Sequence, residues 1–149
     1  MTAESAAPLT SQLVEDSPDA MIFADREGVI RVWNSAAERI FGHRAEAALG
    51  QTLDLIVPER FREQHWTGYD RALTARATKY VGQSLPTRAM RADGTQITVE
   101  LSFAIVLGAD GEALGALATA RDISERFEQE RELRRRLREL EAGAGNAAG

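Results

Sequence analysis

The 149-residue sequence contains no cysteine, and this absence excludes several kinds of site. The chain can form no disulfide, no thiolate metal or iron–sulfur site, no thiol nucleophile and no cysteinyl–flavin adduct. It also lacks any apolar run near the roughly 18–20 residues that a membrane span requires, and its opening residues, MTAESAAPLT, contain no apolar run of signal-peptide length. We therefore expect a cytoplasmic protein that makes no membrane contact.

Basic residues are too few for a broad phosphate-binding face. The net charge is −5 at pH 7, whereas nonspecific affinity for nucleic acid depends on clustered Lys and Arg. No P-loop, Rossmann glycine pattern, Ser/His/Asp order or paired carboxylates can be recognised. We therefore expect neither a nucleic-acid partner nor an enzyme. The 44% hydrophobic composition suits one domain whose core can enclose a small ligand.

The first part of the sequence predicts a cap helix, a β-hairpin and three further helices. Residues 1–16 form an N-terminal cap segment, whose helix is expected at 9–16 and ends before Pro18. The run AMIFADREGVIRVWN predicts two strands joined by the turn DREG. Asn34 can cap the helix SAAERIFG, a short helix fits RAEAAL, and Pro58 suits the start of a longer helix.

The middle of the sequence predicts three more strands, at about 79–91, 96–107 and 113–122, separated by the turns ADGT and ADGE. In QITVELSFAIV, apolar side chains alternate with polar ones, which is typical of a sheet with one buried face. The expected fold is therefore α+β, with a five-stranded antiparallel sheet whose buried face the helices cover. The domain itself is assigned to residues 17–122.

Residues 123–141 predict a C-terminal helix with a partial coiled-coil pattern. Its successive a and d positions hold Ile123, Arg126, Glu130, Leu133, Leu137 and Leu140. Two interpretations stay open: a parallel or antiparallel helix pairing between two subunits, or an amphipathic helix that folds back on its own sheet. The tail at 142–149, AGAGNAAG, has nothing to bury, and we expect it to be disordered.

Three segments in this order resemble a PAS domain: DSPDAMIFADREGVIRVWNSAAERIFG, RADGT and ARDISER. The resemblance runs from about Ser17 to Glu128. It implies the PAS fold, with a small-molecule cavity between sheet and helices and signal output through flanking helices, usually in a dimer. It does not indicate which ligand is bound.

In the stretch FREQHWTGYDRAL, one helical stripe contains Phe61, His65, Tyr69 and Ala72. We therefore expect the His65 side chain to face the core. With its start VPERFREQH, this segment resembles the haem-binding PAS gas sensors attached to histidine kinases. The resemblance implies haem b, with His65 as the axial iron ligand. It further implies a set of cofactor contacts: Arg71 and Lys79 at the propionates, and Tyr80, Leu85, Leu101 and Phe103 on the gas side.

The sequence departs from these oxygen sensors on the gas side. Leu85 stands where they have an arginine that bonds oxygen, so a polar donor to a partly anionic ligand is missing. Tyr80 and Phe103 are bulkier than the aliphatic residues expected there. These departures predict weak oxygen stabilisation and a site better suited to CO, NO or a redox role. An alternative for His65 itself is a structural core histidine.

The residues and the resemblance together predict a sensory PAS module. We expect a homodimer through the N-terminal and C-terminal helices and a downstream signalling partner such as a histidine kinase or regulator. One alternative is a ligand-free dimerisation or protein-interaction module, in which Tyr80 and Phe103 fill the cavity. Another is a non-covalent flavin or organic-acid sensor, in which Gln83, Ser84 and Ser102 supply the polar groups.

Overall fold

The computed structural model of the chain describes residues 3–78 and 83–148. Two predicted cofactor contacts, Lys79 and Tyr80, lie outside the described residues. The elements in chain order are α1 (Ala3–Asp16), β1 (Ala20–Asp25), β2 (Ile30–Trp33), α2 (Ser35–Phe41), α3 (Ala45–Ala48), η1 (Leu53–Leu55), η2 (Glu59–Phe61), α4 (Arg62–Ala75), β3 (Leu85–Met90), β4 (Gln96–Leu107), β5 (Ala113–Asp122) and α5 (Ser124–Ala148).

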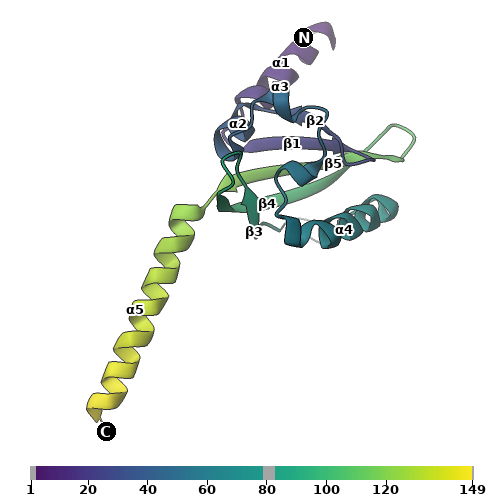
Figure 1. Ribbon diagram of the computed structural model, residues 1–149. Helices are drawn as coiled ribbons and strands as arrows, with labels where there is room; N and C mark the ends of the chain where they lie inside the picture. Colours follow the sequence, from purple (N-terminus) through teal and green to yellow (C-terminus); the bar gives the residue numbers. More distant parts are fainter. Residues whose placement is uncertain (1–2, 79–82, 149) are drawn as a thin grey trace.

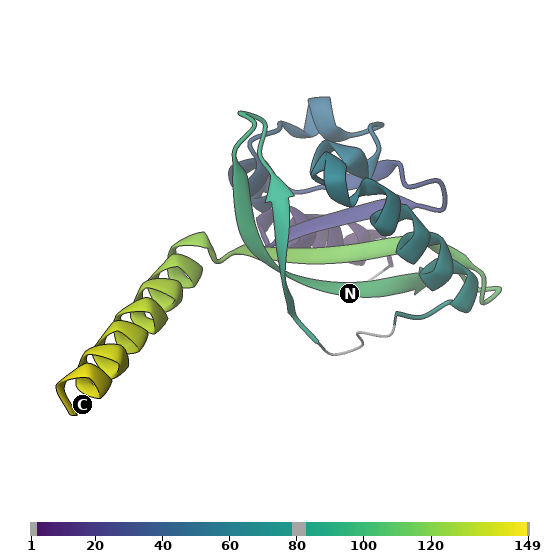
Figure 2. The ribbon, with the colours of Figure 1, turned by 60° about the horizontal axis from the view of Figure 1, so that its bottom comes forward.

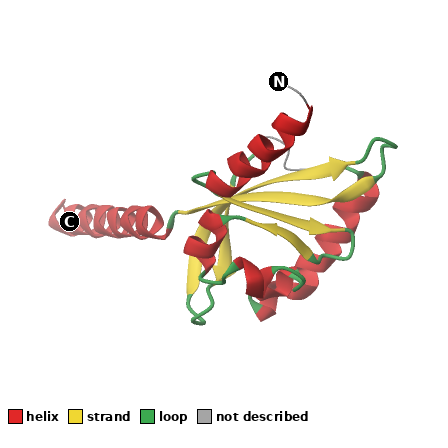
Figure 3. Cartoon of the chain, turned by 90° about the horizontal axis from the view of Figure 1, so that it is seen from above, coloured by secondary structure: helices red, strands yellow, loops and turns green. Residues whose placement is uncertain are grey.

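The five strands form one antiparallel sheet in the order β2-β1-β5-β4-β3 (Figure 1). The first and last strands along the chain, β1 and β5, therefore lie side by side at its centre. Helices α2, α3 and α4 contact the strands, and Figure 3 shows the helical segments beside the twisted sheet. The predicted α+β fold with a five-stranded antiparallel sheet is confirmed.

The core lies between the sheet and the short helices. Phe41 of α2 is fully buried and its ring centroid lies 5.6 Å from that of Trp33, at the end of β2. Ile22 and Val99 reach this core from the sheet, as the alternation of apolar residues in β1 and β4 predicts. The core therefore fills the half of the domain around α2, whereas α4 lies against another part of the sheet.

Asn34 joins three elements at the edge of this core. Its Oδ1 accepts a hydrogen bond from the backbone N–H of Ala37, at 3.0 Å, which confirms the predicted cap of α2. The same oxygen accepts the N–H of Met21 in β1, and its Nδ2 donates to the carbonyl of Val14 in α1. The end of α1 is thereby held against β1 and α2.

Several boundaries differ from the predicted ones. The alanine-rich start of α1 extends the cap helix back to Ala3, because alanine has the highest helix propensity. Pro58 precedes the short η2 turn, so α4 begins only at Arg62. Within the described residues, strand β3 begins at Leu85, whereas the sequence predicted a start at about residue 79. By contrast, β4 and β5 have the predicted bounds.

Helix α5 leaves the sheet and extends away from it (Figure 1, Figure 2). The interpretation in which this helix folds back on its own sheet is therefore wrong. The helix continues past Glu141, its predicted end, through residues 142–148, where the sequence predicted no regular structure. Alanines in this segment favour helix and offset the cost of its glycines. No helix in the described part of the chain is long and apolar enough to cross a membrane.

Candidate functional site

An open pocket of about 910 Å³ lies between α4 and the adjoining strands β4 and β5. This volume is within the range of about 300–1,000 Å³ that is usual for small-molecule sites. Tyr69 and Ala72 contribute to the helix side, and Phe103, Ile105 and Ala116 form the strand side. Figure 2 shows α4 running beside the strands that form this wall. Most of the lining surface is apolar, although polar side chains such as Gln64 and Thr67 also contribute, so the pocket suits a largely apolar ligand with a few polar groups.

Trp66 fixes one side of α4. Its Nε1 donates a hydrogen bond to Asp54 Oδ1 at 2.8 Å. Its ring packs directly on the turn between β1 and β2, where a Cβ added to Gly28 would lie 2.2 Å from the ring. Gly28 also has a φ of 80°, a conformation that other residues rarely adopt. Glycine is therefore required at this close approach.

Tyr69, one turn further along α4, fixes the helix to the end of β1. Its hydroxyl donates to the carbonyl oxygens of Asp25, at 2.6 Å, and Ala24, at 3.0 Å. Burial and the nearby Asp25 carboxylate raise the pKa of Tyr69 to about 12, so the hydroxyl keeps its proton at physiological pH. The two anchors Trp66 and Tyr69 hold the segment of α4 that carries His65.

His65 lies beside both anchors and borders the pocket. Its ring centroid is 4.8 Å from that of Trp66 and 5.8 Å from that of Tyr69. Burial lowers the pKa of His65, although the Asp54 carboxylate opposes this effect. The imidazole is therefore neutral near pH 7, which is the form that binds a metal. Its Nδ1 is buried and has no hydrogen-bond partner in the described part of the chain.

The helix surface beyond His65 is open. A Cβ added to Gly68 would meet no heavy atom within 4 Å, so this position leaves free space beside the pocket. Arg71 is exposed at the same pocket, and its guanidinium makes no hydrogen bond or ion pair within the described residues. A free guanidinium is a good partner for a carboxylate group.

The structure brings together three of the predicted site residues: His65, Arg71 and Phe103 all border the pocket. Leu85 and Leu101 do not border it; they face each other across the β3–β4 ladder, and Leu101 packs against the buried core. The resemblance to haem-binding PAS sensors placed them on the gas side, and an alignment of sequence positions does not determine which part of a cavity a side chain borders in this chain.

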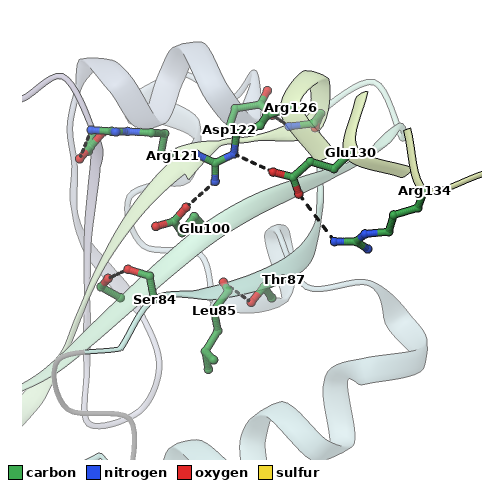
Figure 4. Close-up of polar contacts among 12 residues, drawn as sticks. Ser84, Leu85, Thr87, Glu100, Arg121, Asp122, Arg126, Glu130 and Arg134 are labelled. Carbon is green, nitrogen blue, oxygen red and sulfur yellow. Dashed lines mark hydrogen bonds and ion pairs between the residues drawn. The ribbon is translucent and has the colours of Figure 1, made fainter. Parts of the chain in front are cut away.

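Two of the polar residues suggested for a flavin or organic-acid site also lie elsewhere. Ser84 and Ser102 bond each other, with their Oγ atoms 3.0 Å apart (Figure 4), and neither borders the pocket. Sequence reasoning missed the small residues that make room in it, Ala75 of α4 and Ala116 of β5. Only the register, in which Ala116 lies opposite Ile105, identifies that wall.

The metal-binding side chains at this pocket suit a cofactor that itself supplies most of the ligands to its metal ion. In residues 3–78 and 83–148, no cluster of three or more His, Asp or Glu side chains could hold a metal ion. Among the described residues, a bare cation would find at this pocket only the imidazole of His65 and the carboxylate of Glu63. Haem iron needs only one or two axial ligands from the protein, so a lone neutral histidine beside a large apolar pocket fits it.

A family model for the PAS fold matches residues 9–123 of the chain. The chain belongs to the PAS family. A solved PAS domain from Colwellia psychrerythraea is similar to it with a TM-score of 0.69 and 22% identity, over 80% of this chain and 98% of that one. At this identity the likeness shows the fold, and it agrees with the sheet described above.

Two curated relatives of this PAS domain are much longer than it. An uncharacterized protein of Azorhizobium caulinodans is 33% identical over 139 residues, which are 92% of this chain and 19% of the relative. The sensor protein FixL of Bradyrhizobium diazoefficiens is 35% identical over 86 residues, 58% of this chain and 17% of the relative. The chain thus spans less than a fifth of either protein, and it is a PAS sensory domain.

Proposed function

We propose that this PAS domain senses a diatomic gas or a redox state through haem b bound by His65. The observation that carries the proposal is a combination at α4: a neutral, half-buried imidazole, an apolar pocket of about 910 Å³, and at the same pocket Arg71, which has no ion-pair partner among the described residues. The sequence similarity of this PAS domain to the sensor protein FixL supports a sensory role.

In this proposal each residue has a separate task. His65 supplies the iron ligand, and the anchors Trp66 and Tyr69 hold the helix segment from which it projects. Arg71 pairs with a propionate, and Phe103 and Ile105 exclude water from the strand side of the pocket. When bound, haem supplies an iron centre that takes up a diatomic ligand or changes oxidation state.

Leu85 stands at the sequence position where the resembling sensors have the arginine that stabilises bound oxygen. Leu85 can give no hydrogen bond from its side chain, and it packs opposite Leu101 rather than at the pocket. A partly anionic oxygen ligand would therefore gain little stabilisation, whereas CO and NO need less of it. We expect CO or NO binding, or a redox response, and tight, slowly autoxidising oxygen binding in the ferrous protein would contradict this.

Signal output in this proposal runs through a homodimer to a downstream protein such as a histidine kinase or regulator. Both flanking helices expose leucines: Leu9 and Leu13 of α1, and Leu133, Leu137 and Leu140 of α5. Such helix faces gain free energy by burial against a second copy. Sedimentation equilibrium tests the pairing, and a monomer at high concentration would contradict it.

The test of haem binding is an absorption spectrum after reconstitution with hemin. Wild-type protein and a His43→Ala control, which removes the other histidine of the chain, should both show the Soret band of axially ligated haem. His65→Ala should lose that band or shift it to that of free hemin. A spectrum unchanged in His65→Ala would contradict ligation by His65, and colourless wild-type protein would favour the ligand-free interaction module.

A further inference from the structure

His65 lies at the boundary between two faces of α4. Successive residues of an α-helix are about 100° apart around its axis. Gln64, Gly68 and Arg71 therefore form one face, and all three border the pocket. Trp66 projects on the other side of His65, away from the pocket, and its ring lies 4.8 Å from the imidazole. One edge of the imidazole is thus available to a ligand, and the other edge faces the protein.

The two ring nitrogens of His65 have different surroundings. Nδ1 is buried and has no hydrogen-bond partner in the described part of the chain, so a ligand in the open pocket cannot reach it. Nε2 is therefore the nitrogen that can bind at the pocket. A neutral imidazole binds a metal through an unprotonated nitrogen, so Nε2 can bind only when the ring proton is on Nδ1. The position of one proton decides whether His65 can serve as a ligand.

A carboxylate is fixed near His65, outside the pocket. Asp54 belongs to the short η1 turn, and it does not border the pocket. Its Oδ1 accepts the hydrogen bond from Trp66 Nε1 at 2.8 Å and lies 3.9 Å from Nε of Arg62. Arg62 in turn donates to the carbonyl oxygens of Val57, at 3.1 Å, and Asp54, at 3.2 Å. These contacts hold the negative charge in one place beside α4.

The Asp54 carboxylate acts on His65 through its charge. It raises the pKa of the imidazole, although burial has the larger effect and lowers that pKa. In the neutral ring, a negative charge on the protein side favours the tautomer whose N–H points to that side, because the hydrogen carries the positive end of the bond dipole. The buried Nδ1 lies on that side, whereas Nε2 remains for the pocket.

We propose that Asp54 is a positioning residue for His65: its fixed carboxylate keeps the ring proton on Nδ1 and leaves the lone pair of Nε2 directed to the pocket. The inference deepens the haem function proposed above and rests on it for the identity of the metal. An imidazole that donates its lone pair to a metal gains positive charge, so the same carboxylate also stabilises the metal-bound form of the ring.

The tautomer is measured by ¹⁵N NMR of the haem-free protein at pH 8, where both histidines of the chain are neutral. A His43→Ala background leaves one set of ring signals, which belongs to His65. This protein should show a protonated Nδ1 and an unprotonated Nε2. Asp54→Asn in the same background should lower the ratio of the Nδ1–H form to the Nε2–H form about 2- to 5-fold, because it removes a partly exposed charge.

The substitution of Asp54 by Asn is chosen because it removes the charge but not the hydrogen-bond acceptor. The amide oxygen can still accept the Trp66 indole N–H, so tryptophan emission should stay as in the wild type. Asp70→Asn is the matched control, since it removes an equal charge from an exposed residue of α4. It should change the tautomer ratio by less than about 1.5-fold. Equal changes in the two variants would overturn a specific role of Asp54.

Hemin affinity gives a second measurement of the same effect. The Asp54→Asn protein should bind hemin about 2- to 5-fold more weakly than the wild type, because the metal-bound imidazole loses a stabilising charge. This loss is smaller than the 10- to 100-fold that is usual when a direct hydrogen-bond partner of a metal ligand is removed. The Asp54 carboxylate makes no such bond to His65 and acts only by its charge.

The outcomes separate this inference from haem binding itself. A wild-type His65 protonated on Nε2, or a tautomer ratio unchanged in Asp54→Asn, would overturn the role of Asp54 even if hemin binds. The predicted NMR result in a protein that binds no hemin would contradict the proposed function. The role of Asp54 in placing the proton of His65 would then still be supported, because the NMR measurement needs no haem.

Discussion

Removal of the Asn34 side chain tests how the domain holds its N-terminal helix. The residue is 1% exposed, and its side chain makes four hydrogen bonds. Oδ1 accepts from Met21 and Ala37 at 2.9 and 3.0 Å, and Nδ2 donates to Val14 and Asp19 at 2.8 and 3.1 Å. Asn34→Ala leaves all four backbone groups without this partner, in a region where water has little access.

The expected loss follows from these bonds. The helix cap contributes about 1 kcal/mol, and each of the other three bonds contributes about 1 kcal/mol more. The free energy of unfolding should therefore fall by about 4 kcal/mol. For a domain of this size, each kcal/mol changes the melting temperature by about 2–4 °C, so the midpoint should fall by roughly 8–16 °C.

The assay is thermal and urea unfolding followed by circular dichroism. Asn34→Ser is the matched control: its shorter hydroxyl can still cap Ala37 but cannot reach α1, so its loss should be about 1 kcal/mol smaller. A fall of less than about 4 °C in Asn34→Ala would refute the reasoning, because it would mean that these four bonds are replaced at little cost.

Two further predictions concern the surroundings of His65. Gly28→Ala should lower the free energy of unfolding by about 2 kcal/mol or more and red-shift tryptophan emission, because its Cβ would overlap the Trp66 ring. The control is Gly50→Ala, where φ is 88° but the surrounding space is open, so that only the backbone cost is expected. Equal effects of the two substitutions would contradict the contact between Gly28 and Trp66. Burial lowers the pKa of His65 below the 6.5 of the unfolded chain, so the unfolded state binds more protons and stability should fall as pH drops below about 6.5. Urea unfolding at pH 7 and 5 should show a smaller fall in His65→Gln; an equal fall would contradict the burial of His65.

The strands of the sheet were largely predictable because they are determined by residues that lie close together in the sequence. Strands β4 and β5 have the predicted bounds, since alternation along QITVELSFAIV and the turns ADGT and ADGE act within a few residues. The Asn34 cap was predictable for the same reason. The direction of α5 was not, because a heptad pattern indicates an apolar stripe but leaves open whether the stripe meets its own sheet or another helix.

The pocket was predictable only in part. The inward position of His65 follows from helical periodicity, whereas Arg71 and Phe103 were predicted from the resemblance to haem-binding PAS sensors. The contacts that fix α4 join residues far apart in the sequence: the Tyr69 hydroxyl bonds the Ala24 carbonyl, and Trp66 packs on Gly28. The periodicity of one helix or strand does not indicate which residue of another element it contacts. These contacts could therefore be found only from the folded structure.

The most direct test of haem ligation by His65 is chemical rescue of a His65→Gly variant. Deletion of the imidazole leaves the pocket and its Arg71 in place but removes the iron ligand. After reconstitution with hemin, the variant should lack the wild-type Soret band, and added imidazole should restore it, because free imidazole can enter the space that the side chain has left. A wild-type spectrum in His65→Gly without imidazole would contradict the account.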